Sequence, residues 1–200
     1  MSFQIAHYIR ISKGKVLRNE KLLTDELVVT PDELYKLIGA SYPKFFKMDI
    51  LCRWAWSASE ALLIYNGLSL YTDLNKNQVA IVLATADGCI EVDKRYNETT
   101  ATIPSPALFV YTLPNIMLGE ICIRHGFKGE QACVVNENFD SEELFFWVND
   151  LLENRGMEAC LCGWVNATNT EQDICLFWVT KGNNGINLSP AAFRQLYNNN

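Results

Sequence analysis

The apolar residues of this chain form several short continuous runs, separated by longer stretches in which apolar and polar positions mix. Continuous runs lie at residues 79–85, 132–135, 159–162 and 174–179, and a looser alternation covers residues 3–10. Short apolar runs rich in β-branched residues are typical of strands that are covered on both faces of a sheet. We predict five strands at these positions.

Between these runs lie segments whose apolar residues recur every three or four positions, which is the spacing of a helix with one buried face. Their ends carry capping signals. Thr30 and Glu33 form a capping box, and Asp140 or Ser141 begins a later helix. Glycine marks the end of several of these segments. The predicted helices cover residues 30–39, 46–66, 89–102, 115–124, 141–156 and 189–197.

The order of these elements predicts the class of fold. Strands alternate with helices until the last two strands, which follow each other directly, and this order is typical of an α/β layered fold with a mostly parallel sheet. No repeat, linker or low-complexity block divides the chain. Its 200 residues, 49% of them hydrophobic, are enough for one core, so we predict a single domain over residues 1–200.

Charge and cysteine content exclude several kinds of protein. With 17 basic and 23 acidic residues the net charge is −6, which argues against a nucleic-acid partner. We find no secretory signal and no apolar stretch long enough to span a membrane. The seven cysteines lie mostly among apolar residues and include no Cys-x-x-Cys pair, so we expect buried thiols, no metal site, no cofactor and a reducing cytoplasm.

Five segments between residues 46 and 167 carry a resemblance to a known family. They are Met48-Asp49 with Glu60-Ala61-Leu62 and Asn66-Gly67-Leu68, the run 79–85, Ser105-Pro106 with Leu113-Pro114-Asn115, residues 123–130, and residues 159–167. In this order and spacing they resemble the N-terminal half of a β-ketoacyl synthase, a thiolase-like condensing enzyme. The nearest group is the small ketosynthase-like proteins of bacterial aryl-polyene and flexirubin clusters.

That resemblance implies a single thiolase-like half with a five-stranded, mostly parallel sheet, its last strand antiparallel, and helices on both faces. In the family, the catalytic Cys lies on a tight turn after the third strand. Counted from Gly129, this position falls on Asn138, which is flanked by Glu137 and Phe139. A carboxamide does not attack thioesters, and the acidic neighbours Glu137 and Asp140 disfavour a thiolate. The resemblance therefore leaves the chain without a catalytic nucleophile.

The family also uses two histidines that belong to its C-terminal half, which has no counterpart here. The only histidines are His7, on the first predicted strand, and His125, at the end of a helix. For both we expect structural or surface roles, and the helix dipole would suit a surface cation at position 125. We therefore do not expect independent 3-oxoacyl synthase activity.

A single half of a two-half fold leaves one helix layer open, and aromatic residues point to where a partner would cover it. Phe145, Phe146 and Trp147 are consecutive on one predicted helix, so at least one of them must face away from the core. The alternative is that loops or the N-terminal segment of this chain cover the open helix layer. The resemblance places residues 105–117 near the dimer interface and acyl tunnel. The residues of that segment expected at the interface or substrate site are Phe109, Tyr111, Leu113 and Met117.

The leading hypothesis is a non-catalytic accessory subunit, similar to a chain-length factor, in fatty acid or polyketide-type biosynthesis. Its expected partner is a ketosynthase-type protein or a second copy of itself, with an acyl carrier protein as a further partner. One alternative is a small acyltransferase or thioesterase that uses a relocated cysteine, such as Cys122 or Cys133. Another is a homodimeric acyl-binding protein.

Overall fold

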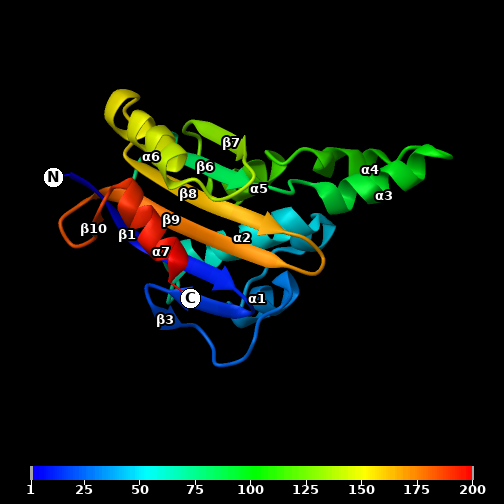
Figure 1. The fold of residues 1–200 in the computed structure, drawn as a ribbon, viewed down its shortest axis with the longest axis horizontal. Helices are drawn as coiled ribbons and strands as arrows, with labels where there is room; N and C mark the ends of the chain where they lie inside the picture. Colours follow the sequence, from blue (N-terminus) through cyan, green and yellow to red (C-terminus); the bar gives the residue numbers. More distant parts are fainter. Residues whose placement is uncertain (1, 200) are drawn as a thin grey trace.

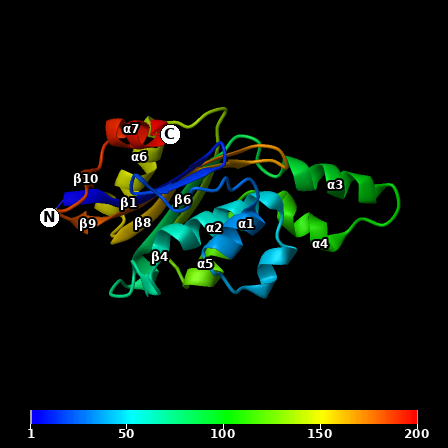
Figure 2. The same ribbon diagram turned by 90° about the horizontal axis from the view of Figure 1, so that it is seen from below.

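The computed structural model describes residues 2–199, and its centre is one long mixed β-sheet between two layers of helices (Figures 1 and 2). The strands follow the order β3-β2-β1-β9-β8-β6-β7, and β10 pairs with the beginning of β1. The strands of this sheet are β1 (Ser2–Ser12), β2 (Lys15–Arg18), β3 (Lys21–Leu22), β6 (Val79–Thr85), β7 (Gln131–Val135), β8 (Ala159–Ala167), β9 (Gln172–Gly182) and β10 (Ile186–Asn187).

The predicted five-stranded, mostly parallel sheet is wrong in both number and direction. The sheet has eight strands, and among the described residues only the pairings of β6 with β7 and with β8 are parallel. Strand β9 runs opposite to both β8 and β1, so its position between them makes two long pairings antiparallel. The short strands β2, β3 and β10 add further antiparallel pairings. Direction depends on tertiary neighbours, which the apolar pattern does not encode.

Helices cover both faces of the sheet, as predicted (Figure 2). One face carries α1 (Pro31–Leu37), α2 (Ile50–Leu63) and α5 (Ile116–His125), packed on a core that includes Trp54 and Trp56. The other face carries α6 (Ser141–Asn149), which continues into a π-helical turn (Asp150–Asn154), and α7 (Pro190–Asn198). Their core includes Cys160, Phe177 and Phe193. All seven residues of β6 between the two layers are buried.

A helical arm projects from the end of the sheet (right in Figures 1 and 2). It consists of α3 (Ile90–Thr100), α4 (Pro106–Phe109) and a 3₁₀ turn (Val110–Thr112). The prolines at 104, 106 and 114 divide this stretch into short pieces because proline does not fit inside a helix. The arm leads back into α5, which ends at Gly126 in the left-handed conformation, as predicted.

The predicted capping box is confirmed, but the long helix predicted at residues 46–66 is not a single element. The Thr30 side chain accepts a hydrogen bond from the Glu33 amide, and the Glu33 carboxylate accepts from the Thr30 amide, which confirms the capping box. The predicted helix at residues 46–66 divides into a 3₁₀ helix (Pro43–Lys47), α2 and a hairpin of β4 (Ile64–Tyr65) and β5 (Leu68–Ser69). Asp49 causes the break, since its carboxylate accepts from two amides of the first turn of α2.

The apolar run at residues 159–162 predicted a strand that ends before Gly163, and this boundary is wrong. Strand β8 continues to Ala167, and Gly163 lies inside it with φ +144°. A Cβ atom at this position would lie 2.0 Å from the carbonyl oxygen of Cys175 on β9. The glycine therefore permits close approach of two backbones within the sheet instead of marking its end.

Candidate functional site

The loop between β7 and α6 carries the residues that the sequence singled out. Asn138 and Glu137 are exposed and Phe139 is partly buried. The Asn136 amide donates to the carbonyl oxygen of Thr85 (3.0 Å), so the chain leaves β7 alongside the end of β6. The loop thus lies at the carboxyl ends of two parallel strands, a place where α/β proteins commonly bind ligands.

Two hollows meet at this loop. An open cleft of about 370 Å³ is lined by the loop residues 136–141 and by Arg194 of α7. A crevice of about 10 Å³ lies between α6 and the sheet, where Val82, Leu144 and Trp147 are among its lining residues. Asn136, Phe139 and Asp140 line both the cleft and the crevice, and Phe139 is the large apolar side chain among them.

Carboxylates dominate the beginning of α6. The Asp140 side chain accepts hydrogen bonds from the amides of Glu142 (2.9 Å) and Glu143 (3.1 Å). Glu143 in turn accepts from the side chain of Asn136 (2.5 Å). The amides that stabilise an anion at a helix N-terminus are thus already occupied, and a thiolate beside Asn138 would meet like charges.

The native thiols are poor candidates for a relocated nucleophile. Burial raises the pKa of Cys133 and Cys122, each to about 11. Cys89 is the N-cap residue of α3, yet burial, together with the charges of Asp49 and Asp93, raises its pKa to about 12. Thiols with such raised pKa values are protonated near neutral pH, so they lack the nucleophilic form.

The two histidines lie away from this loop. His7 is half-buried on β1, its Nδ1 2.8 Å from the side-chain nitrogen of Asn19. His125 belongs to the core on the opposite face of the sheet, where Tyr71 contacts its Nδ1 at 2.8 Å. Burial, and then the charges of Arg124 and Lys76, lower its pKa to about 3. The surface role expected for His125 is wrong, because the residue is 2% exposed and neutral.

The second set of predicted residues lies on the arm and divides into two pairs. Phe109 and Leu113 are 55% and 52% exposed, whereas Tyr111 and Met117 are buried. The Tyr111 hydroxyl donates to the carboxylate of Glu120 on α5 (3.2 Å). Two of the four residues therefore hold the base of the arm and the other two face outward.

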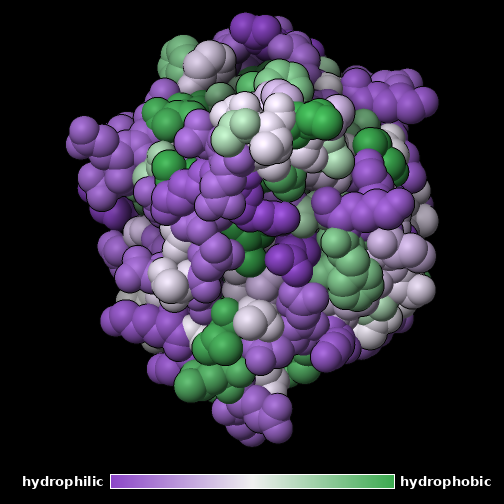
Figure 3. Space-filling model, turned by 90° about the vertical axis from the view of Figure 1, so that its right-hand side faces the viewer, coloured by the Kyte–Doolittle hydropathy of each residue, from purple (hydrophilic) through white to green (hydrophobic). Residues whose placement is uncertain are grey.

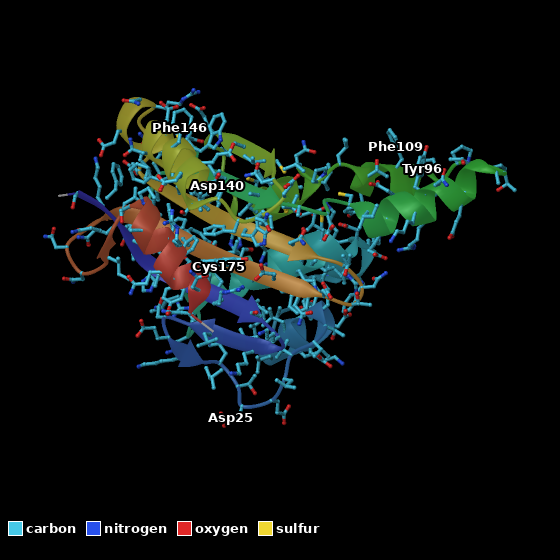
Figure 4. All side chains as sticks on the ribbon, viewed as in Figure 1. Asp25, Tyr96, Phe109, Asp140, Phe146 and Cys175 are labelled. Carbon is cyan, nitrogen blue, oxygen red and sulfur yellow. The ribbon has the colours of Figure 1, made fainter. Side chains whose placement is uncertain are left out.

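The structure adds exposed apolar residues that the sequence did not single out. On the arm these are Ile103 (83% exposed) and Val110 (50% exposed), and Tyr96 lies beside Phe109 with ring centres 5.5 Å apart (Figure 4). Phe146 on α6 is 62% exposed, which confirms that one of the three consecutive aromatic residues faces away from the core. Seen from the arm end, hydrophobic patches interrupt a largely hydrophilic surface (Figure 3).

Two further properties concern the described part of the chain. No group of three or more His, Cys, Asp and Glu residues is arranged to hold a metal ion there. No single helix in residues 2–199 is long and apolar enough to cross a membrane. The segments Pro106–Thr112 and Ile116–His125 reach that length and composition only together, and they are bent by 94°.

Comparison with known proteins gives a clear result for the fold alone. No protein-family model and no curated protein sequence matches the chain. Among solved structures it is similar to the ishigamide ketosynthase/chain length factor, with a TM-score of 0.67 and 14% identity over 91% of this chain. It is also similar to a chain of the ketosynthase ApeO in complex with its chain length factor ApeC from Xenorhabdus doucetiae, with a TM-score of 0.62 and 13% identity.

The fraction of the matched chain that this chain covers differs between these structures. The chain spans 63% of the length of the ishigamide protein but 90% of the matched chain in the ApeO–ApeC complex, where 98% of this chain is covered. A third match, at a TM-score of 0.62 and 12% identity, is the AntDE:AntF structure of a type II polyketide synthase carrier protein with its ketosynthase, of which 62% is covered. The resemblance to β-ketoacyl synthases is thus confirmed at the level of the fold.

Proposed function

We propose that this chain is a non-catalytic accessory subunit, similar to a chain-length factor, that pairs with an active ketosynthase in fatty acid or polyketide-type biosynthesis. The observation that carries the proposal is a ketosynthase fold whose loop between β7 and α6 holds Asn138 where the resemblance places the catalytic Cys. The amide of Asn138 has no nucleophilic lone pair for a thioester, and Asp140 occupies the helix amides that would activate a thiolate.

The kinds of protein with this fold support the same proposal. One match is a complex of a ketosynthase with its chain length factor, and the chain compared there has about the same length as this one. Another is a ketosynthase with its acyl carrier protein. An acyl carrier protein is therefore the second partner that we propose, and the cytoplasm, where free thiols stay reduced, is the proposed location.

The pairing surface that we propose is the open edge of the sheet at β7. Among the described strands β7 pairs only with β6, so one side of its five-residue backbone is available to a partner strand. Val135 at the end of β7 and Phe146 on the neighbouring α6 are each 62% exposed. In Figure 1 this edge lies between α6 and the base of the arm.

The arm supplies the side chains that reach beyond this edge. Its base is fixed, because Glu120 on α5 accepts from the Tyr111 hydroxyl and forms an ion pair with Lys44 (2.8 Å). Its outer surface offers Phe109 and Leu113, large apolar side chains of the kind that interfaces bury. In this proposal they contact the partner near its acyl chain, and Asn138 lines the adjoining pocket.

Co-expression with the ketosynthase encoded nearest to this chain tests the pairing. We expect the two proteins to co-purify and to elute as one complex on size exclusion with light scattering. Val135→Asp should disrupt the complex, because it places a charge on an edge that the partner would shield from water. Leu68→Asp is the matched control, since Leu68 is 74% exposed on the β4–β5 hairpin, at the end of the molecule opposite the arm (Figure 2).

The proposal fails if the two proteins never co-purify and deletion of this gene leaves the chain length of the product unchanged. Light scattering of the chain by itself tests whether it forms a homodimer. A stable dimer that Val135→Asp dissociates, together with no binding of a ketosynthase, would favour the homodimeric acyl-binding protein instead.

A further inference from the structure

The last helix of the described chain, α7, covers the face of the sheet beside the candidate loop. Its Ala192, Phe193 and Leu196 side chains are buried, and the Phe193 ring lies 4.8 Å from that of Phe177 on β9. The opposite side of α7 is polar, with Arg194 exposed to solvent. The helix thus buries three apolar side chains against this face of the molecule.

A partly buried polar cluster, centred on the buried Arg10, fastens the end of α7 to two strands. Arg10 on β1 is 4% exposed, and its Nε donates to the carbonyl oxygen of Tyr197 (2.7 Å). Its Nη1 pairs with the Asp173 carboxylate on β9 (2.5 Å), and its guanidinium lies 4.5 Å from the centre of the Tyr197 ring. The Tyr197 hydroxyl donates to the other oxygen of Asp173. One residue of α7 therefore receives most of the polar contacts that hold it.

The same tyrosine also holds the candidate loop. The Tyr197 ring stacks on Phe139 with centres 4.2 Å apart and an angle of 19°. Phe139 lines both the open cleft and the small crevice beneath α6. One turn earlier on α7, Arg194 donates to the Ser141 hydroxyl and to Glu142, both 3.2 Å away. The position of α7 thus decides whether Phe139 can move.

We propose that α7 is a latch: release of Tyr197 from Arg10 and Asp173 lets the helix lift as a unit, frees Phe139 and joins the cleft to the crevice. A peripheral helix held by few buried side chains opens at a lower free energy than the sheet beneath it. The closed state described by the structure is then one of two states of the loop, and a ligand that needs the crevice would favour the open one.

Two native cysteines can be used to detect this opening. Cys175 on β9 pairs directly with Arg10 on β1, and it belongs to the core on the face that α7 covers. Cys52 on α2 is equally buried, but in the core of the opposite face. Lifting of α7 uncovers the face that holds Cys175 but not the one that holds Cys52, whereas global unfolding exposes both thiols. Mass spectrometry after timed labelling with N-ethylmaleimide follows the two cysteines separately in the full chain.

Tyr197→Ala removes the stacking contact and the hydroxyl bond, so we expect Cys175 to be labelled about 10- to 100-fold faster, at a rate that stays well above that of Cys52, which is exposed only by global unfolding. Tyr197→Phe keeps the ring and should give a smaller acceleration in a protein that folds normally. Gln195→Ala, at an exposed position of the same helix, is the control and should change neither rate. Equal labelling rates of Cys175 and Cys52 in the wild type and in the variants, or no acceleration of Cys175 in either tyrosine variant, overturns the proposal.

Discussion

Acid should destabilise this protein largely through one buried side chain, His125. Its imidazole is 2% exposed, contacts the Tyr71 hydroxyl at 2.8 Å and lies among Phe127 and the other aromatic residues of the core. Burial and the nearby cations Arg124 and Lys76 lower its pKa to about 3, against 6.5 for a free histidine. Glu60 lies 3.5 Å from Nε2, but its charge is already neutralised by Arg124.

The sign of the effect follows from these two values. The unfolded chain binds a proton at position 125 below about pH 6.5, whereas the folded chain does so only near pH 3. Protons therefore favour unfolding, so the stabilising contribution is complete above pH 6.5 and is lost as the pH falls. Each pH unit in this window costs about 1.4 kcal/mol, so lowering the pH from about 6.5 to about 5.0 should cost roughly 2 kcal/mol of unfolding free energy.

The assay is urea unfolding of the wild type and His125→Gln at pH 5.0, 6.0 and 7.0. A glutamine side chain does not titrate, so the unfolding free energy of this variant should fall by roughly 2 kcal/mol less over this range. His7→Gln is the comparison. The pKa of His7 is lowered in the same direction, by burial and then by Arg18, but the residue is only half-buried, so its replacement should flatten the curve less. Parallel curves for wild type and His125→Gln would refute the reasoning.

Three further outcomes can be checked with single variants. Asn138→Cys should be alkylated by iodoacetamide no faster than an ordinary exposed thiol, because Asp140 occupies the helix amides; rapid labelling at pH 6 with acyl transfer would favour the enzyme hypothesis. Thr30→Ala should lower the unfolding free energy by about 1 kcal/mol in urea titrations, because it removes the capping box. Gly163→Ala should leave little folded protein by circular dichroism, since the new Cβ would meet the Cys175 carbonyl; normal expression would contradict the close approach.

Local signals in the sequence were enough to place most helices and the five longest strands of the sheet. The Thr30 and Asp140 caps, the Gly126 helix end and the buried run of β6 all depend on residues within a few positions of each other. The broken helix at residues 46–66 shows the limit of this kind of reasoning. Asp49 resembles any polar residue of a helical surface in the pattern, but in the structure its carboxylate begins a new helix.

Features set by distant contacts were not predictable in this way. Gly163 resembles a strand end until its approach to Cys175 on the neighbouring strand is seen. His125 lies next to a helix-ending glycine, which suggested the surface, yet Tyr71, 54 positions away, covers it. At the candidate site, the sequence located the loop around Asn138 but not the stacking of Tyr197 on it, because the two segments are far apart in the chain.

The structure also changes where a partner must bind. A single half of a two-half fold was expected to leave a helix layer uncovered. Instead α7 covers the sheet face beside α6, and the exposed residues of these two helices are polar except for Phe146 and Ala191. A second half laid on this face would have to displace α7 and break its contacts with Arg10 and Asp173. Association at the β7 edge and along the arm requires neither step, because the β7 backbone and side chains such as Phe109 are already accessible. Partner binding and the closed state of α7 are therefore compatible, and loss of one need not abolish the other.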